Sequence, residues 1–255
     1  MSLNSNIHFS KDQLWNDYDS TGTIADKKIP WVLRNIPPDV KSILDVGCGN
    51  GIITNVLNES YQVKGVDLSE AALKQVNCST VQSSSDNIPL ESESADMVFS
   101  SQLLEHLTDE QLAGTVKEFK RLAAKYLLIT VPHKEFLKIC EAKCPSCGHV
   151  FNTNGHYQTF DIHRLEQLFG DEYKLVRHDL GGNLHRGYHP ALMHIRQNYG
   201  NRYFNPPNYT MCPHCNNDSF PLIKGNLISK VCNGLNRVIA PKSPYWILTL
   251  FRKKL

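Results

Sequence analysis

Short, continuously apolar runs alternate along this chain with segments in which apolar residues recur every three or four positions. Runs of the first kind are typical of strands that are buried on both faces, as in a parallel sheet. Segments of the second kind predict amphipathic helices packed on such a sheet. The pattern predicts strands at residues 43–46, 63–66, 126–131, 173–180 and 246–251, and helices at 52–57, 109–122 and 162–169.

Polar and glycine residues mark the ends of several predicted helices. Ser69 precedes a short helical segment at 70–73, and its hydroxyl is placed to cap that segment. Thr108 and Gln111 have the spacing of a capping box, and Gly170 is expected to end the helix before it. Strands that alternate with helices predict an α/β fold, in which right-handed crossovers place helices on both faces of the sheet.

Composition and charge narrow the class of protein. The 255 residues, 41% of them apolar, fit one domain with elaborations or one domain plus a small module. No apolar run approaches the ~18 residues that a membrane helix needs. The polar N-terminus lacks the apolar core of a signal peptide, so we expect a cytoplasmic protein without a membrane span.

The net charge of +2 hides an asymmetry between the two parts of the chain. Residues 1–132 carry 11 basic against 17 acidic residues, whereas residues 133–255 carry 16 against 8. The second part is therefore expected to present a mildly basic surface to an anionic group.

Three alternate glycines follow the first predicted strand directly, at Gly47, Gly49 and Gly51. A turn without side chains lets the backbone approach a ligand that lies over the N-terminus of the next helix. A nicotinamide dinucleotide site is the competing interpretation, but its fingerprint has the spacing G-x-G-x-x-G. Here the spacing is G-x-G-x-G, and Asp45 before the turn would repel a pyrophosphate. An acid at this place suits a ligand with a cationic centre, and Asp67 at the end of the second strand can accept ribose hydroxyls.

The segment 43–51, Ile-Leu-Asp-Val-Gly-Cys-Gly-Asn-Gly, resembles motif I of the class I S-adenosylmethionine-dependent methyltransferases. Residues 81–90 resemble the segment after the third strand of that family, which surrounds the adenine, although Ser84 stands where aspartate is usual. The adenine amino group would then be held by a hydroxyl or by Asp86. Residues 95–107 resemble the fourth strand and the loop after it.

The resemblance implies the family's fold and cofactor. The fold is a doubly wound, Rossmann-like sheet of seven strands with a C-terminal antiparallel hairpin, and the cofactor is S-adenosylmethionine. The implied cofactor-binding residues are Asp45, Gly47, Cys48, Gly49, Gly51, Asp67, Leu68, Ser84, Ser85 and Ser101. Residues 41–132 would form the cofactor-binding core. Residues 1–40 would form a helical segment before the core, with Trp15, Tyr18, Trp31 and Leu33 as apolar contacts.

Four of the eight cysteines form two C-x-x-C pairs, Cys144 with Cys147 and Cys212 with Cys215. Each pair has a proline after its first cysteine, as in a zinc knuckle, and two knuckles supply the four thiolates of a structural Zn²⁺ site. A redox C-x-x-C should open a helix in a thioredoxin-like unit, which neither pair does. His149, His156 and His214 are alternative ligands. The other cysteines, at positions 48, 78, 140 and 232, are expected to be ordinary thiols.

The two knuckles lie in connections that leave the carboxyl edge of the predicted sheet, where ligands bind in open α/β folds. We therefore expect residues 133–255 to complete the sheet and to carry two cap insertions, at about 134–160 and 182–243. Zinc would staple these insertions into a small cap over the cofactor, and the cap would recognise the substrate.

Methyl transfer to a hydroxyl needs a group that takes a proton, and histidine is the natural base at neutral pH. His133 follows the fifth strand and His156 lies in the first cap insertion, and we interpret both as candidate catalytic residues. His106 after the fourth strand is interpreted as a packing residue. The segment 205–208, Asn-Pro-Pro-Asn, matches an element of DNA amino-methyltransferases only by chance, since it lies in the cap.

These observations favour O-methylation of a small molecule or a carbohydrate, with an acceptor that carries negative charge. One alternative is a nucleic-acid methyltransferase whose zinc module binds RNA or DNA. The near-neutral total charge and the absence of a basic stripe with interleaved aromatics argue against nucleic acid. A second alternative is a protein that binds S-adenosylmethionine without turnover. The sequence carries no signal for an oligomeric state.

Overall fold

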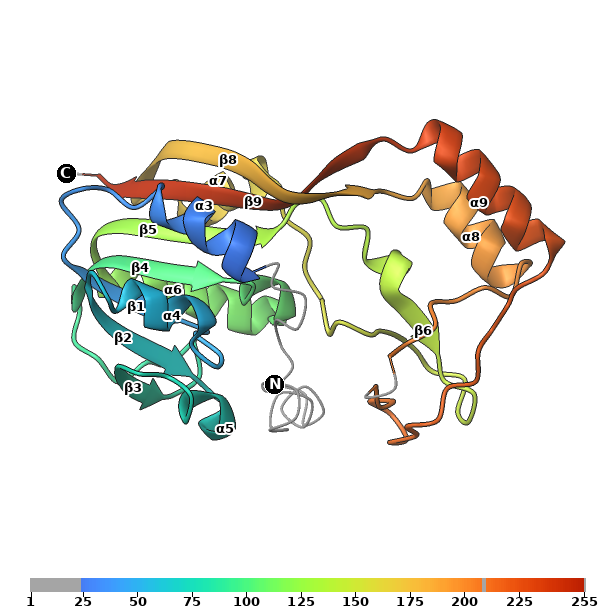
Figure 1. Cartoon of the computed structure of the whole chain (residues 1–255), viewed down its shortest axis with the longest axis horizontal. Coiled ribbons are helices and arrows are strands. Elements are labelled where there is room, and N and C mark those ends of the chain that lie inside the picture. The colour runs from blue at the N-terminus through green and yellow to red at the C-terminus, as the bar shows by residue number, and fades with distance from the viewer. Residues whose placement is uncertain (1–23, 208–209, 255) are drawn as a thin grey trace.

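The computed structural model describes residues 24–207 and 210–254, and it contains one mixed sheet of seven strands in the order β3-β2-β1-β4-β5-β9-β8 (Figure 1). Four parallel strands lie at the predicted positions: β1 (Ser42–Val46), β2 (Gln62–Asp67), β4 (Ala95–Ser101) and β5 (Ala123–Pro132). The parallel strand β3 (Ser79–Gln82) overlaps the start of the segment that was expected to follow the third strand, and β8 (Tyr173–Arg186) begins at the predicted residue. Strand β9 (Lys242–Lys253) is antiparallel to both β5 and β8. The Rossmann-like fold with a C-terminal hairpin is confirmed.

Helices cover both faces of the sheet, as the doubly wound topology requires. One apolar cluster packs α6 (Asp109–Leu122) and α7 (Ile162–Phe169) on one face, and a second packs α3 (Ile29–Leu33) and α4 (Ile52–Leu57) on the other. In β5 the side chains of Leu127 and Ile129 enter the first cluster, whereas Leu128 enters the second. A strand buried on both faces has to be apolar throughout, which is why this run is continuous.

The predicted helix ends are confirmed. The Ser69 hydroxyl accepts a hydrogen bond from the Ala72 amide and so caps α5 (Glu70–Leu73). Thr108 and Gln111 form the reciprocal capping box of α6. The last helical turn of α7 ends at Gly170. Before the sheet, the structure describes a single π-helical turn η1 (Ile24–Lys28) that leads into α3, in which Trp31 is buried and Leu33 half-buried. The predicted contacts of Trp15 and Tyr18 lie outside the described residues.

Strands β8 and β9 are longer than the predicted 173–180 and 246–251. They remain paired from Tyr173 with Lys253 to Arg186 with Lys242, so the hairpin continues beyond the carboxyl edge of the sheet as a two-stranded ribbon. The apolar pattern that marks a buried strand ends where the ribbon leaves the sheet, so the sequence underestimates the lengths of β8 and β9. Arg252 and Lys253, which lie beyond the predicted end of the last strand at 251, also pair within the sheet.

The ribbon carries a cap that lies beyond the carboxyl ends of the strands (Figure 1). The cap contains the 3₁₀ turn η3 (Leu137–Cys140), the two-stranded sheet of β6 (Glu141–Lys143) and β7 (Val150–Asn152), and the helices α8 (Pro190–Asn198) and α9 (Leu227–Ile239). Neither α8 nor α9 is among the helices that the sequence predicts. Within the described part of the chain, no helix has both the length and the apolar character to cross a membrane.

Candidate functional site

The glycine turn between β1 and α4 has the left-handed backbone that its sequence requires. The φ angles of Gly47, Gly49 and Gly51 are 77°, 54° and 80°, a region that other residues rarely adopt. A Cβ atom on Gly47 would approach Cβ of Leu103 to 3.0 Å. At these glycines the turn therefore presents backbone atoms to the space at the carboxyl edge of the sheet.

Two acids flank this turn, of which Asp45 is buried and Asp67 is half-buried. The Asp67 carboxylate accepts hydrogen bonds from the backbone N–H groups of Gly49, at 2.9 Å, and Ser69, at 2.8 Å. Asp45 accepts a hydrogen bond of 2.7 Å from the Thr54 hydroxyl. Burial raises the pKa of Asp45 to about 7, with a smaller contribution from the nearby Asp67, and burial also raises the pKa of Asp67. Two carboxyl groups that are costly to ionise favour a ligand with hydroxyl donors or positive charge.

These residues line a cavity of about 650 Å³ at the carboxyl edge of β1, β2 and β4. Nine of the ten predicted cofactor-binding residues line it, namely Asp45, Gly47, Cys48, Gly49, Asp67, Leu68, Ser84, Ser85 and Ser101. Gly51 does not line the cavity but stands at the N-cap of α4. Lining residues that the sequence interpretation missed include Lys28, Gln82, Ser83, Gln102, Leu103 and His106. Gln82 and Ser83 directly precede the predicted Ser84, so their position in the chain was the available signal.

Serines and an acid shape the end of the cavity after β3. The Ser84 hydroxyl donates to the Asp86 carboxylate, and the Ser85 hydroxyl lies 2.8 Å from that of Thr115 on α6. Ser84 lines the cavity whereas Asp86 does not, so Asp86 orients the serine from behind.

A second set of polar residues adjoins the cavity, which we call the polar cluster: Glu105, His106, Glu135 and His156. Glu105 and His106 belong to the 3₁₀ turn η2 (Leu104–His106) after β4, and His106 lines the cavity. The rings of His106 and His156 meet edge to face, with their centroids 4.6 Å apart. His156 Nδ1 lies 2.5 Å from the Glu135 carboxylate, and both residues are buried. Glu135 and His156 lie far from Glu105 and His106 in the sequence, and only the fold brings the two pairs together.

Two residues of the polar cluster, Glu105 and His156, have pKa values above their ordinary values. Burial raises the pKa of Glu105 to about 7, although the nearby His156 and Lys28 oppose the shift. Burial lowers the pKa of His156, but the hydrogen bond and charge of Glu135 outweigh it, so that this pKa lies above its ordinary value. Neither carboxylate oxygen of Glu105 accepts a hydrogen bond from a described residue. A cluster of this kind, with shifted pKa values beside a cavity, is typical of functional sites.

The second predicted catalytic histidine, His133, lies apart from the cavity lining. Its backbone N–H donates to the carbonyl of Tyr245, and it forms an isolated bridge with Phe160. Burial lowers the pKa of His133, as does the charge of Lys134. Its buried Nδ1 atom has no hydrogen-bond partner among the described residues.

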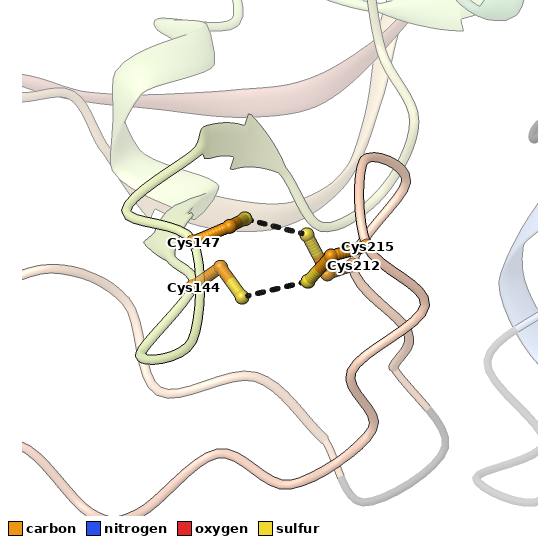
Figure 2. A group of neighbouring side chains, drawn as sticks. All are labelled: Cys144, Cys147, Cys212 and Cys215. Carbon is orange, nitrogen blue, oxygen red and sulfur yellow. Dashed lines mark hydrogen bonds between the residues drawn. The ribbon is translucent and has the colours of Figure 1, made fainter.

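The two cysteine pairs meet in the cap, although 64 residues of chain separate them in the sequence (Figure 2). Cys144 Sγ lies 3.6 Å from Cys215 Sγ, and Cys147 Sγ lies 3.7 Å from Cys212 Sγ. All four sulfur atoms lie within 4.8 Å of one another. Zn–S bonds of about 2.3 Å in a tetrahedron require sulfur atoms about 3.8 Å apart, so the four thiols fit a zinc ion. His149 and His214 stack on each other nearby but are not part of this group.

The cap and the cavity are adjacent but distinct. No described residue of 134–160 or 182–243 lines the cavity. The cap touches the site through the loop before α7, where the N–H groups of Tyr157 and Gln158 donate to the Glu105 carbonyl. The four cysteines therefore lie where the two cap insertions meet, while the polar cluster connects the cap to the cavity.

Residues 44–126 match the family described as "Methyltransferase domain". This segment contains the glycine turn, Asp45, Asp67 and part of the polar cluster. The chain contains a class I S-adenosylmethionine-dependent methyltransferase domain. The family match covers the cofactor side of this methyltransferase and stops before the cap.

Solved structures share the fold of this methyltransferase at low sequence identity. A SAM-dependent methyltransferase from Archaeoglobus fulgidus is 16% identical over 89% of this chain and 93% of its own, with a TM-score of 0.55. A possible histamine N-methyltransferase from Thermotoga maritima is 14% identical over 98% and 100%, with a TM-score of 0.55. Magnesium protoporphyrin IX methyltransferase from Synechocystis, with bound SAH, is 11% identical over 95% and 83%, with a TM-score of 0.50. No curated protein matches the chain significantly.

The four-cysteine group predicts a metal requirement for the cap. Purified protein is expected to contain about one zinc ion per chain by elemental analysis, and Cys212→Ser is expected to lose it and to unfold at a lower temperature. Cys78→Ser, which changes a thiol outside the cap, is the control and should keep the zinc. Zinc content well below one per chain in the unmodified protein would contradict the assignment.

Proposed function

We propose that this methyltransferase transfers the methyl group of S-adenosylmethionine to a hydroxyl of a small molecule or a carbohydrate. The observation that carries the proposal is the polar cluster, which joins the cofactor cavity at His106. Hydroxyl acceptors, unlike thiolates, must lose a proton as they react, and the cluster supplies imidazole and carboxyl groups at that place.

The cavity residues have separate roles in this proposal. The turn at Gly47 and Gly49 lets the cofactor approach the backbone, and the Asp67 carboxylate accepts hydrogen bonds from the ribose hydroxyls. Ser84 and Ser85 face the adenine. Asp45, buried beneath the turn, favours the positive charge of the donor. Gly51 acts from outside the cavity, by allowing the left-handed start of α4.

The acceptor oxygen attacks the methyl carbon in line with the carbon–sulfur bond. The new C–O bond forms as the C–S bond breaks, and the electron pair stays on sulfur, which leaves as the thioether of S-adenosylhomocysteine. The hydroxyl proton leaves through the polar cluster. His156 is the proposed catalytic histidine with the better support, because Glu135 orients its ring. His133 remains a proposed second one, supported by its unpartnered buried Nδ1 atom.

The cap favours an acceptor with negative charge. Within the second cap insertion, residues 182–243, Asp218 is the only acidic residue, against seven lysines and arginines. Phosphorylated, nucleotide-linked or carboxylated acceptors would suit such a surface. The alternative of a nucleic-acid acceptor is less well supported, because the exposed positions of α9 are largely apolar rather than basic or aromatic. We also propose a cytoplasmic location, since none of the eight cysteines forms a disulfide.

The cofactor assignment predicts the effect of a single isosteric change. Asp67→Asn is expected to weaken S-adenosylhomocysteine binding about 100-fold by calorimetry, because the charged acceptor of two hydroxyl hydrogen bonds is lost. Asp96→Asn is the matched control, since Asp96 also accepts two backbone N–H groups, those of Lys41 and Ser42, at the opposite end of β4. Equal affinities in the two variants would contradict the role of Asp67.

The hydroxyl-transfer proposal is tested with S-adenosylmethionine labelled in its methyl group. We expect the label to enter anionic hydroxylated small molecules or sugars, rather than RNA or DNA, when mixed acceptor pools are supplied. His156→Ala should lower the rate with the identified acceptor by about 100-fold or more while S-adenosylhomocysteine affinity is kept. His163→Ala, on the exposed side of α7, is the control. Label in nucleic acid alone would overturn the proposal in favour of the alternative.

A further inference from the structure

We propose that Glu105, His106 and His156 bind a divalent transition-metal cation at the edge of the cofactor cavity, separate from the four-cysteine site. The ligand atoms of these three residues lie within 4.8 Å of one another. Two imidazoles and one carboxylate are a ligand set suited to cations such as Mn²⁺ or Fe²⁺, with further positions open for water or an acceptor oxygen.

The orientation of both histidine rings fits a metal site. His156 Nδ1 donates to the Glu135 carboxylate at 2.5 Å, and His106 Nδ1 donates to the Gly155 carbonyl at 3.3 Å. In each neutral ring the remaining nitrogen, Nε2, is then the one with a lone pair. Metal-binding histidines nearly always have their other nitrogen fixed in this way by a carboxylate or a carbonyl. Glu135 would therefore act as a positioning residue for His156.

Glu105 gives the second, independent observation. Its side chain is fully buried, and neither carboxylate oxygen has a hydrogen-bond partner in the described part of the chain. Buried carboxyl groups are normally hydrogen-bonded, paired or bound to a metal. Lys28 is close enough to act on Glu105 electrostatically, but its ammonium group lies 3.4 Å from Ser101 Oγ and over the ring of Trp246. A cation between Glu105 and the two imidazoles would supply the missing partner.

Such a cation would deepen the proposed function, and its role in the reaction rests on that proposal. It would act as a Lewis acid on the acceptor hydroxyl, which binds to an open position and releases its proton to solvent water. The resulting alkoxide oxygen then attacks the methyl carbon, and sulfur keeps the electron pair of the broken bond. His106 and His156 would in that case hold the cation rather than take the proton themselves.

The test is titration of the zinc-loaded protein with Mn²⁺, observed by electron paramagnetic resonance. Hard Mn²⁺ competes poorly for the four thiolates, so its binding reports on the polar cluster. We expect about one bound Mn²⁺ per chain, with hyperfine coupling to imidazole nitrogen. Glu105→Gln should weaken binding at least tenfold, and Glu135→Gln should also weaken it. Glu118→Gln is the control, because Glu118 pairs with Arg121 away from the cluster.

The absence of bound Mn²⁺ in the unmodified protein, or binding without nitrogen coupling, would overturn the cation site. This measurement needs no variant, so it remains decisive if a variant fails to fold. Either result would mean that a proton on His156 is the partner of the buried carboxyl groups. Equal affinity of Glu105→Gln and Glu118→Gln would overturn it as well. Mn²⁺ binding with nitrogen coupling, in a protein that methylates no hydroxyl acceptor, would support the site and contradict the proposed function instead.

An independent observation concerns α9, whose apolar face is exposed to solvent and whose buried side contains polar residues. Six apolar residues share one face of the helix, and all of them are between 42% and 84% exposed: Leu227, Ile228, Val231, Leu235, Val238 and Ile239. The buried side toward α8 instead contains Ser229, Cys232 and Asn236. Asn236 is held there by hydrogen bonds to the backbone of Gly187 and His189. This anchor fixes the helix with its apolar face outward.

We infer that this apolar face binds the surface of an anionic phospholipid bilayer. Charge complementarity supports this partner, because Lys230 and Arg237 lie on α9, Lys224 precedes it and Lys242 follows it, and no acidic residue follows Asp218. A short basic helix with a strong apolar face lies in the plane of a bilayer interface rather than across it. The helix also stands at the outer end of the cap (Figure 1), where no described element covers it. Docking there would bring the methyltransferase to acceptors at a membrane surface.

Sedimentation with vesicles tests this inference. The full chain is expected to bind vesicles that contain phosphatidylglycerol and to bind pure phosphatidylcholine vesicles much more weakly. Replacing Val231 and Val238 together by Asn should lower the binding at least tenfold, since two apolar side chains that would enter the bilayer are lost. Val176→Asn, an exposed valine on the edge strand β8, is the control. Unchanged binding in the double variant, or a dimer in light scattering that the double variant dissociates without vesicle binding, would overturn it.

Discussion

Strand β9 connects the two parts of this molecule, because its backbone hydrogen-bonds to β5 on one side and to β8 on the other. Along β5 it completes the sheet that supports the cofactor cavity. Beyond the sheet it continues against β8 as a ribbon, which carries α8 and α9. Gly182 allows this continuation, since a Cβ atom there would approach the ring of Trp246 to 2.7 Å. The pairing of one strand thus fixes where the cap stands relative to the carboxyl edge.

The cap depends on a second constraint, which is the meeting of its two cysteine pairs. Without a metal, four thiols at about 3.6 Å from their neighbours gain little from one another, and the long connections of the cap have few apolar residues to bury. The described contacts between cap and cavity are concentrated at the loop before α7, which donates to the Glu105 carbonyl. Movement of the cap would therefore be transmitted first to the polar cluster.

The cofactor side of the protein could be predicted closely from local sequence. Strand β1, the glycines and Asp45 lie within a few residues of one another, and the alternation of buried positions along β5 determines which side chains face which helix layer. Ser84 and Ser85 could be placed for the same reason, because they directly follow a strand. The polar cluster could not be placed, since Glu105 follows β4 whereas Glu135 and His156 lie near the two ends of the first cap insertion. His106 was interpreted as a packing residue, but it reaches the cavity lining because the η2 turn directs it there.

The sequence by itself determined the class of fold, the glycine turn, the two acids beside it and the pairing of the cysteines into two knuckles. Each of these depends on residues that are close in the chain and on backbone preferences that act locally. Only the tertiary structure decided that the cap lies beside the cavity rather than lining it, that His156 and not His133 joins the polar cluster, and that α9 turns its apolar face outward. These outcomes depend on contacts between segments far apart in the chain, such as the hydrogen bonds of Asn236 to the 187–189 segment, and apolar spacing alone cannot show which face of a helix is buried.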